Sequence, residues 1–329
     1  MLFGIMRAII LLISLTALIL FQILFGLGEV DSQMIYASNE TMTRDFNVAA
    51  TGDWGCKPET IDTVGNISAK NPELVLGLGD YAYRNNATCW FQITDPISDK
   101  MKIVIGNHDA FQYTQNGSQP SPVRLKQYMG HFNLTHQYYY FDYRSVHFIA
   151  MSTETLFGNA SKQYNFVKND LQKVALNNNV KWIIVFYHKL AYSSPSNSTK
   201  SLPKLREIYH PLFEKYGVDL VLQAHNHNYQ RTYPLKFNPI NSSNPIVTDK
   251  NTFNYNNPDG QIFATVGTGG ANQLHEFTGK APQTVVQFKA FGFLNLDITR
   301  NGTKLIGNFV DNNGKLRDHF SITKSTNND

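Results

Sequence analysis

The sequence predicts an α/β fold built as one domain. Short apolar runs that end in polar residues alternate with segments of helical periodicity over the first two thirds of the chain. The final third is rich in strand-forming residues with Gly and Asn turns, which is typical of antiparallel strands. Neither an internal repeat nor a linker-like stretch follows residue 40, so we expect a single domain over residues 45–325.

The expected elements follow this order along the chain. Apolar runs predict strands, several of them running directly into turns, within residues 46–55, 72–80, 102–109, 138–153 (two adjacent strands), 180–189, 218–227, 260–270 and 291–315. Helical spacing of apolar residues predicts helices within residues 58–71, 165–179 and 202–217.

Composition agrees with a folded protein that is neither disordered nor of low complexity. Hydrophobic residues make up 42% of the 329 residues and charged residues 16%, so the chain can bury a sizeable core. The net charge is only +4 and no block of lysines and arginines occurs, so nucleic acid is not an expected partner.

Residues 1–37 are expected to be an N-terminal leader, either a signal peptide or a membrane anchor. Arg7 precedes an uncharged apolar run over residues 8–28, and the first acids are Glu29 and Asp31. The run is long enough for a membrane anchor and also fits a long signal peptide. Both alternatives place the rest of the chain outside, because the positive charge lies before the run. We therefore expect an exported protein, either secreted or held on the outer face of the membrane.

Two further features fit export. Cys56 and Cys89 could form one disulfide in an oxidising compartment, with two unpaired thiols as the alternative. Nine Asn-x-Ser/Thr glycosylation sequons occur, although chance explains several of them in a chain rich in Asn. They begin at Asn39, Asn66, Asn86, Asn116, Asn133, Asn159, Asn197, Asn241 and Asn301.

Five predicted strands end in metal-binding side chains. These are Asp53, Asp80 with Tyr83, Asn107 with His108, His188, and His225 with His227. Strands that stack side by side bring their carboxyl ends to one edge, where open α/β sheets bind ligands. Such a crowd of carboxylates and imidazoles is too costly as core and is the ligand set of metal ions. It exceeds what one ion can bind, so we expect two ions bridged by a carboxylate.

The same segments resemble a known family. GDWG, GDYAY, GNHD, YHK and AHNH, in this order, resemble the five blocks of the calcineurin-like metallophosphoesterases. The tyrosine three residues after Asp80 is similar to the mark of the purple acid phosphatases within that superfamily. The resemblance implies a four-layer α/β/β/α sandwich of two mixed β-sheets.

The resemblance also implies a role for each site residue. Fe(III) would bind Asp53, Asp80, Tyr83 and His227, and a divalent Fe, Zn or Mn would bind Asp80, Asn107, His188 and His225. The family hydrolyses phosphate esters by attack of a metal-bound hydroxide. His108 would bind the substrate phosphate or stabilise the transition state. Trp54 is expected to form a wall of the site, and residues 266–270 a tight turn beside it.

The sequence departs from the family at two points. Ala224 replaces the usual glycine before the paired histidines. Asn197 and Ser198 occupy positions where many members carry a histidine that binds substrate or protonates the leaving group, which leaves the general acid open.

The resulting prediction is a binuclear phosphatase acting on small phosphate monoesters. The alternatives are a phosphodiesterase for nucleotides or glycerophosphodiesters, and a non-catalytic binding protein of the same fold. The sequence leaves the oligomeric state open.

Overall fold

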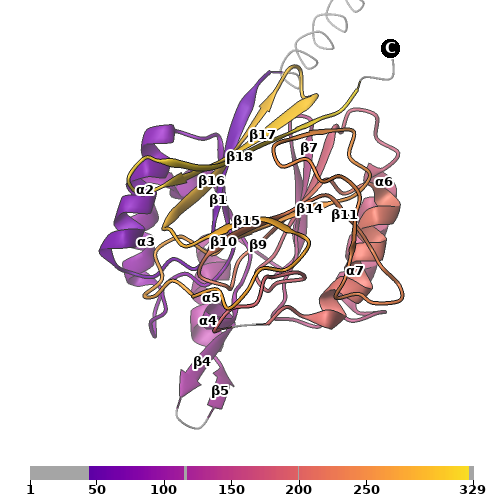
Figure 1. The fold of residues 1–329 in the computed structure, drawn as a ribbon. Helices are drawn as coiled ribbons and strands as arrows, with labels where there is room; N and C mark the ends of the chain where they lie inside the picture. Colours follow the sequence, from indigo (N-terminus) through magenta and orange to yellow (C-terminus); the bar gives the residue numbers. More distant parts are fainter. Residues whose placement is uncertain (1–43, 115–116, 199, 326–329) are drawn as a thin grey trace, which may run out of the picture. The chain divides into compact units, whose positions relative to one another are not determined.

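Two seven-stranded mixed sheets face each other in the computed structural model, which describes residues 44–114, 117–198 and 200–325 (Figure 1). The first sheet has the order β13 (Asn254–Asn256), β18 (Leu316–Thr323), β17 (Lys304–Asp311), β16 (Gly292–Thr299), β1 (Phe46–Thr51), β2 (Leu74–Gly77) and β3 (Met101–Ile103). The second has the order β15 (Thr284–Phe288), β10 (Tyr229–Thr232), β14 (Ile262–Val266), β9 (Leu220–Gln223), β8 (Trp182–Phe186), β7 (Val146–Ala150) and β6 (Tyr139–Tyr143).

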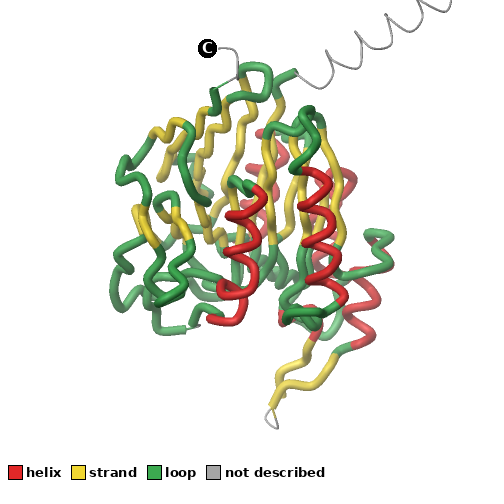
Figure 2. Tube along the Cα trace, turned by 90° about the vertical axis from the view of Figure 1, so that its right-hand side faces the viewer, coloured by secondary structure: helices red, strands yellow, loops and turns green. Residues whose placement is uncertain are grey.

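Helices cover the outer face of each sheet (Figures 1 and 2). Helices α2 (Pro58–Lys70) and α3 (Thr88–Thr94) lie against the first sheet, and α6 (Lys162–Val174) and α7 (Pro203–Tyr216) lie against the second. The predicted four-layer α/β/β/α sandwich is therefore confirmed. Smaller elements complete the described chain: η1 (Asp95–Lys100), α4 (Asn107–Ala110), β4 (Phe111–Thr114), β5 (Gly117–Pro120), α5 (Pro122–His131), β11 (Leu235–Lys236) and β12 (Ile246–Val247).

Three hydrophobic clusters hold the layers together, one between the sheets and one under each pair of helices. Strand β1 contributes residues to two of these clusters. Val48 and Ala50 pack between the sheets, whereas Ala49 faces the helical layer with Val64 of α2. Because both faces of the central strands are buried, these strands read as continuous apolar runs.

The helix ends follow ordinary capping rules. Helix α7 begins with Pro203, whose missing N–H costs nothing in the first turn. It ends before Gly217, which adopts the left-handed conformation with φ of 70°. Helix α2 likewise begins with Pro58 and ends before Asn71 in the left-handed region. These signals place the helices where the sequence predicts them.

The directions of the strands bring the predicted site together. Strands β1, β2 and β3 run parallel in the first sheet, and β7, β8 and β9 run parallel in the second. The backbone N–H of Gly52, just after β1, donates to the carbonyl of Val266 at the end of β14 and so links the two sheets there. The site therefore draws on the strand ends of both sheets.

Cys56 and Cys89 form a disulfide, with their Cα atoms 5.9 Å apart. It ties the turn after β1 to helix α3. The predicted leader, residues 1–37, lies outside the described residues. Within the described ranges, no helix is both long enough and apolar enough to cross a membrane.

A buried neutral histidine predicts a loss of stability in acid. His210 of α7 donates from Nε2 to the carbonyl of Leu235 (3.2 Å) and accepts at Nδ1 from the hydroxyl of Tyr192 (2.7 Å). Burial lowers the pKa of His210 to about 4. Between this value and the usual pKa of about 6.5, the unfolded chain binds more protons, so the free energy of unfolding falls as the pH falls.

His210 should therefore contribute a loss of about 2 kcal/mol between pH 7 and pH 5. Urea unfolding of the wild type and of His210→Gln at both pH values measures it, because glutamine does not titrate. Equal losses in the two proteins would show that His210 does not remain neutral in the folded chain.

Candidate functional site

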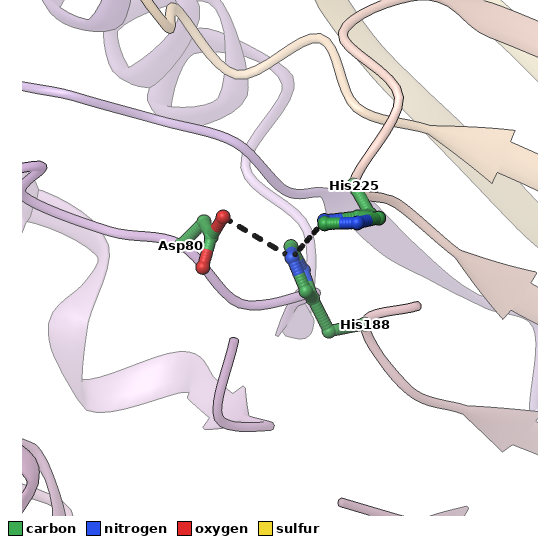
Figure 3. A group of neighbouring side chains, drawn as sticks. All are labelled: Asp80, His188 and His225. Carbon is green, nitrogen blue, oxygen red and sulfur yellow. Dashed lines mark hydrogen bonds and ion pairs between the residues drawn. The ribbon is translucent and has the colours of Figure 1, made fainter. Parts of the chain in front are cut away.

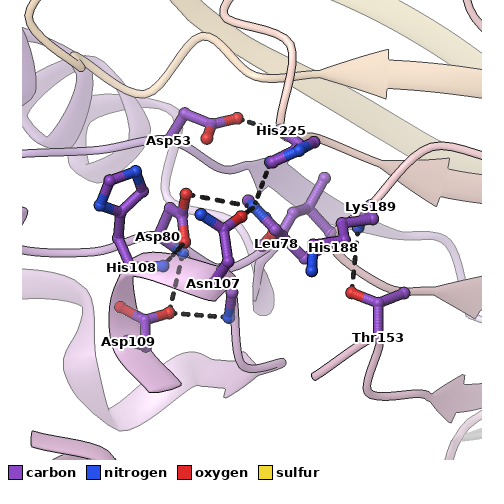
Figure 4. A network of polar contacts seen from close by, with 12 residues as sticks. Asp53, Leu78, Asp80, Asn107, His108, Asp109, Thr153, His188, Lys189 and His225 are labelled. Carbon is purple, nitrogen blue, oxygen red and sulfur yellow. Dashed lines mark hydrogen bonds and ion pairs between the residues drawn. The ribbon is translucent and has the colours of Figure 1, made fainter. Parts of the chain in front are cut away.

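The structure brings all eight predicted site residues together at one edge of the two sheets, and Figure 4 labels all of them except Tyr83 and His227. Their positions on the elements are as follows: Asp53 after β1, Asp80 and Tyr83 after β2, Asn107 and His108 at the start of α4 after β3, His188 after β8, and His225 and His227 after β9.

Four of these residues adopt a rare backbone conformation. Positive φ angles occur at Asp53 (56°), Asp80 (56°), Tyr83 (52°) and His225 (70°). Non-glycine residues seldom adopt this region, and such strain gathers at functional sites. The crowding leaves no room for a side chain at Gly106, where a Cβ atom would lie 2.2 Å from Asp80 Oδ1. These unfavourable backbone conformations orient the side chains into the site, at some cost to the stability of the fold.

A first donor group surrounds Nε2 of His188 (Figure 3). This nitrogen lies 3.2 Å from Asp80 Oδ2, 3.1 Å from Asn107 Oδ1 and 3.1 Å from His225 Nδ1. The other ring nitrogen, Nδ1, donates to the carbonyl of Leu78 at 2.8 Å. Histidines that bind metals commonly donate their second N–H to a backbone carbonyl in this way.

The contacts of His188 suit a cation better than a proton. With the hydrogen on Nδ1, Nε2 of the neutral ring presents a lone pair to the Asp80 and Asn107 oxygens, which also carry lone pairs. A proton added to Nε2 could serve only one of its neighbours, whereas a cation can bind several at once. Asp80, His188 and His225 each place one ligand atom within 4.8 Å of the other two.

A second donor group centres on the hydroxyl of Tyr83. Its oxygen lies 2.9 Å from Asp53 Oδ1 and 3.0 Å from His227 Nε2, and the last two atoms are 3.4 Å apart. Nδ1 of His227 faces the carbonyl of Gln273 at 2.8 Å, so Nε2 again presents its lone pair to the group.

One oxygen belongs to both groups. Asp80 Oδ2 lies 3.2 Å from His188 Nε2 and 3.4 Å from the hydroxyl of Tyr83. Nitrogen and oxygen ligands about 2.0–2.2 Å from one ion lie roughly 3 Å from each other, which matches these spacings. Both donor groups therefore fit a cation, and Asp80 lies where a bridging carboxylate would lie.

The charges in the site are strongly coupled. Burial opposes charge on His188, but the Asp80 carboxylate outweighs burial and raises the pKa of His188 to about 10. Burial and the neighbouring His188 lower the pKa of His225 to about 3. Burial, followed by Asp53 and Asp80, raises the pKa of Tyr83 well above its usual value. The Asp53 carboxylate likewise outweighs burial and raises the pKa of His227. The two aspartates thus stabilise positive charge in the site, which favours a bound cation.

Two neighbours support Asp80. The backbone N–H of His108 donates to Asp80 Oδ1 at 2.7 Å, and the His108 ring packs on Tyr83 with centroids 4.5 Å apart. The carboxylate of Asp109 accepts from the backbone N–H groups of Asp80, Tyr81 and Gly106 at 2.8–2.9 Å. Asp109 therefore shapes the turn that carries Asp80.

A cavity of about 430 Å³ opens over the donor groups. The residues that line it are Asp80, Asn107, His108, Lys189, Ser198, His225, His227 and His275. Lys189 and His275 were not among the predicted site residues. His275 lies outside the five motifs, and no periodic pattern marks it.

The expectation for Trp54 was wrong. Its side chain is fully buried and packs edge-on against Trp90 in the cluster under α2 and α3. It lies next to Asp53 in sequence, but the turn after β1 directs it away from the cavity. Gly267, in contrast, lies at the site as expected, since a Cβ there would meet Asp53 Oδ2 at 2.6 Å.

Several proteins named as phosphatases or phosphodiesterases are similar to this chain. It is 27% identical over 277 residues to "Probable inactive purple acid phosphatase 1" of Arabidopsis thaliana, covering 78% of this chain and 44% of the relative. It is 28% identical to "Acid phosphatase type 7" of Mus musculus, covering 89% and 74%. It is 27% identical to "Nucleotide pyrophosphatase/phosphodiesterase" of Hordeum vulgare, covering 81% and 76%. The chain thus spans less than half of the first of these relatives.

Solved structures and a family profile agree with these similarities. Purple acid phosphatase PPD1 from yellow lupin (Lupinus luteus) seeds has the same fold, with a TM-score of 0.74 and 23% identity, over 86% of this chain and 54% of the lupin chain. The profile described as calcineurin-like phosphoesterase matches residues 46–229, more than half of the chain. The chain therefore belongs to the calcineurin-like phosphoesterase family, with the purple acid phosphatases among its relatives.

Proposed function

We propose that this protein hydrolyses phosphate monoesters at a binuclear metal site. The observation that carries the proposal is the pair of donor groups joined by one oxygen of Asp80 beneath a polar cavity. Two ions held there would activate a water molecule as nucleophile and neutralise charge on the phosphoryl group. The mouse relative's name, acid phosphatase, supports the monoester substrate.

Each site residue would have a defined role as metal ligand or phosphate ligand. Asp53, Tyr83 and His227 would hold one ion, Asn107, His188 and His225 the other, and Asp80 both. His108 would bind a phosphoryl oxygen, because its ring lines the cavity beside Tyr83. Both aspartates are deeply buried, which lowers the local dielectric constant and strengthens their attraction for the ions.

The proposal is tested by comparing two substrates on the metal-loaded chain. We expect faster hydrolysis of p-nitrophenyl phosphate, a monoester, than of bis(p-nitrophenyl) phosphate, a diester. Loss of both activities with a chelator and recovery with metal would support the mechanism. Failure of the loaded protein to hydrolyse either ester would contradict it and favour a non-catalytic binding protein.

A phosphodiesterase is the second candidate. The name of the barley relative, nucleotide pyrophosphatase/phosphodiesterase, favours it, and its identity to this chain nearly equals that of the mouse relative. Faster hydrolysis of the diester in the same assay would select this function. Non-catalytic binding is less well supported, because every residue of both donor groups is present even though one plant relative is named as probably inactive.

The identity of the metals can be tested at Tyr83. If ferric iron occupies the Asp53, Tyr83 and His227 group, the purified protein should show a broad visible absorption band from tyrosinate bound to iron. Tyr83→Phe should remove the band without unfolding the chain, since phenylalanine keeps the packing against His108. A protein with two manganese ions, full activity and no visible band would contradict the iron assignment.

A further inference from the structure

One wall of the cavity carries an imidazole that belongs to neither donor group. His275 lines the cavity, and its ring stacks on His227 with centroids 4.0 Å apart and planes 12° apart. Resting on the proposed function, we infer that His275 contacts the substrate and donates a hydrogen bond to an oxygen of the bound phosphate ester.

Two backbone hydrogen bonds fix the ring and its hydrogen. The backbone N–H of His227 donates to Nδ1 of His275 at 3.0 Å, and the backbone N–H of His275 donates to the carbonyl of His227 at 2.8 Å. Nδ1 must therefore carry a lone pair, so the neutral ring has its hydrogen on Nε2. No described residue accepts a hydrogen bond from Nε2. The ring thus keeps a preorganised N–H donor for a ligand in the cavity.

Residues 195–198 pair with the segment that carries His275. The backbone N–H of Asn197 donates to the carbonyl of Glu276, and that of Thr278 donates to the carbonyl of Pro195, each at 3.0 Å. Ser196 and Phe277 form an antiparallel bridge between these bonds.

This register places Ser198 opposite His275, and both residues line the cavity. The expected family histidine is missing at positions 197 and 198. An imidazole on the facing segment reaches the same part of the cavity.

The surrounding side chains fit an anionic ligand. Lys189 lines the same cavity, and its ammonium group pairs with the buried Glu154 at 2.8 Å. That pair holds the lysine in place and leaves two further N–H donors on its ammonium group. His108 lines the cavity as well, and its ring packs on Tyr83 with centroids 4.5 Å apart. A phosphate group over the donor groups would therefore be within the cavity that His108, Lys189 and His275 line.

A purely structural role for His275 makes a different prediction. If the ring only positioned His227, its loss would release metal from the Asp53, Tyr83 and His227 group. If it contacts substrate, its loss would weaken phosphate binding while both ions stay bound. Metal content and phosphate affinity therefore separate the two roles.

The test uses the metal-loaded full chain and inorganic phosphate. His275→Phe keeps a ring stacked on His227 but removes both nitrogens, and His136→Phe, at an exposed site, is the matched control. We expect His275→Phe to retain two ions and to raise both the Kd for phosphate and the KM for a monoester by roughly ten- to hundredfold. Adding Ser198→His to His275→Phe should restore part of the affinity.

The inference is overturned if His275→Phe keeps both ions and binds phosphate as tightly as the wild type. Loss of a metal ion with no separate effect on phosphate would also overturn it. His275→Met replaces the phenylalanine variant if that protein fails to fold. A wild type that binds phosphate without hydrolysing esters would contradict the proposed function alone, and the phosphate affinities would still decide the role of His275.

Discussion

Asp80→Asn should reduce phosphate-ester hydrolysis by more than about a hundredfold. Loss of a residue that only hydrogen-bonds to a metal ligand typically lowers activity by about ten- to a hundredfold, and loss of a ligand should cost more. Asparagine keeps the shape of the side chain but removes the charge of the one residue shared by both donor groups. Oδ2 of Asp80 lies within 3.4 Å of both His188 Nε2 and the Tyr83 hydroxyl, and the side chain is buried. The carboxylate of Asp53 reaches the first group only through the backbone N–H of His225 (2.7 Å), whereas Asp80 faces the side-chain ligand atoms of both groups.

The measurement combines kcat/KM with metal content and the unfolding midpoint. Asp62→Asn is the matched control, because Asp62 is an exposed residue of α2. The control should keep full activity and two ions per chain. An Asp80→Asn protein with both ions and an unchanged rate would contradict the assignment of Asp80 as the shared ligand.

The largest expected effect on stability lies between the two sheets. Arg231 of β10 makes two hydrogen bonds to Asp318 of β18, at 2.7 and 2.9 Å, and both side chains are buried. Tyr229 and Tyr255 complete the network. Arg231→Met leaves the Asp318 carboxylate buried without its partner, which should lower the free energy of unfolding by about 3–5 kcal/mol.

A double variant separates the ion pair from the packing. Arg231→Met combined with Asp318→Leu removes both charges, so it should be more stable than Arg231→Met alone. Urea unfolding of the three proteins measures the difference. Equal destabilisation in the single and double variants would show that the network stabilises the sheets by shape and not by charge.

The sequence predicts that the site residues gather at one edge, because each follows a buried strand, whereas the four layers and the assignment of each residue to one of two ions follow only from the resemblance to the family. In β2, for example, Val75 and Leu76 point to opposite faces of the sheet and both are buried. The strand ends at Gly77, and Asp80 lies in the turn that follows. The carboxyl ends of parallel strands meet at one edge of a sheet, so motifs at successive strand ends are predicted to lie close together. The sequence does not show that two sheets share the site, because pairing between distant strands leaves no local pattern.

Other features escape such reasoning for physical reasons. His275 reaches the cavity through backbone bonds to His227 and through the bridge to the 195–198 segment, which link positions about 50 and 80 residues apart. Trp54 shows the opposite error, since a residue adjacent to Asp53 in sequence points into the hydrophobic core. Elements between β2 and β6, such as α3 and the β4–β5 hairpin, are too short to show a clear period.

Metal titration of the metal-free chain tests the central claim most directly. We predict that each chain binds two ions and that hydrolysis of a phosphate monoester reaches its full rate only when the second ion is bound. Full activity in the metal-free protein, or at one ion per chain, would contradict a binuclear site shared through Asp80.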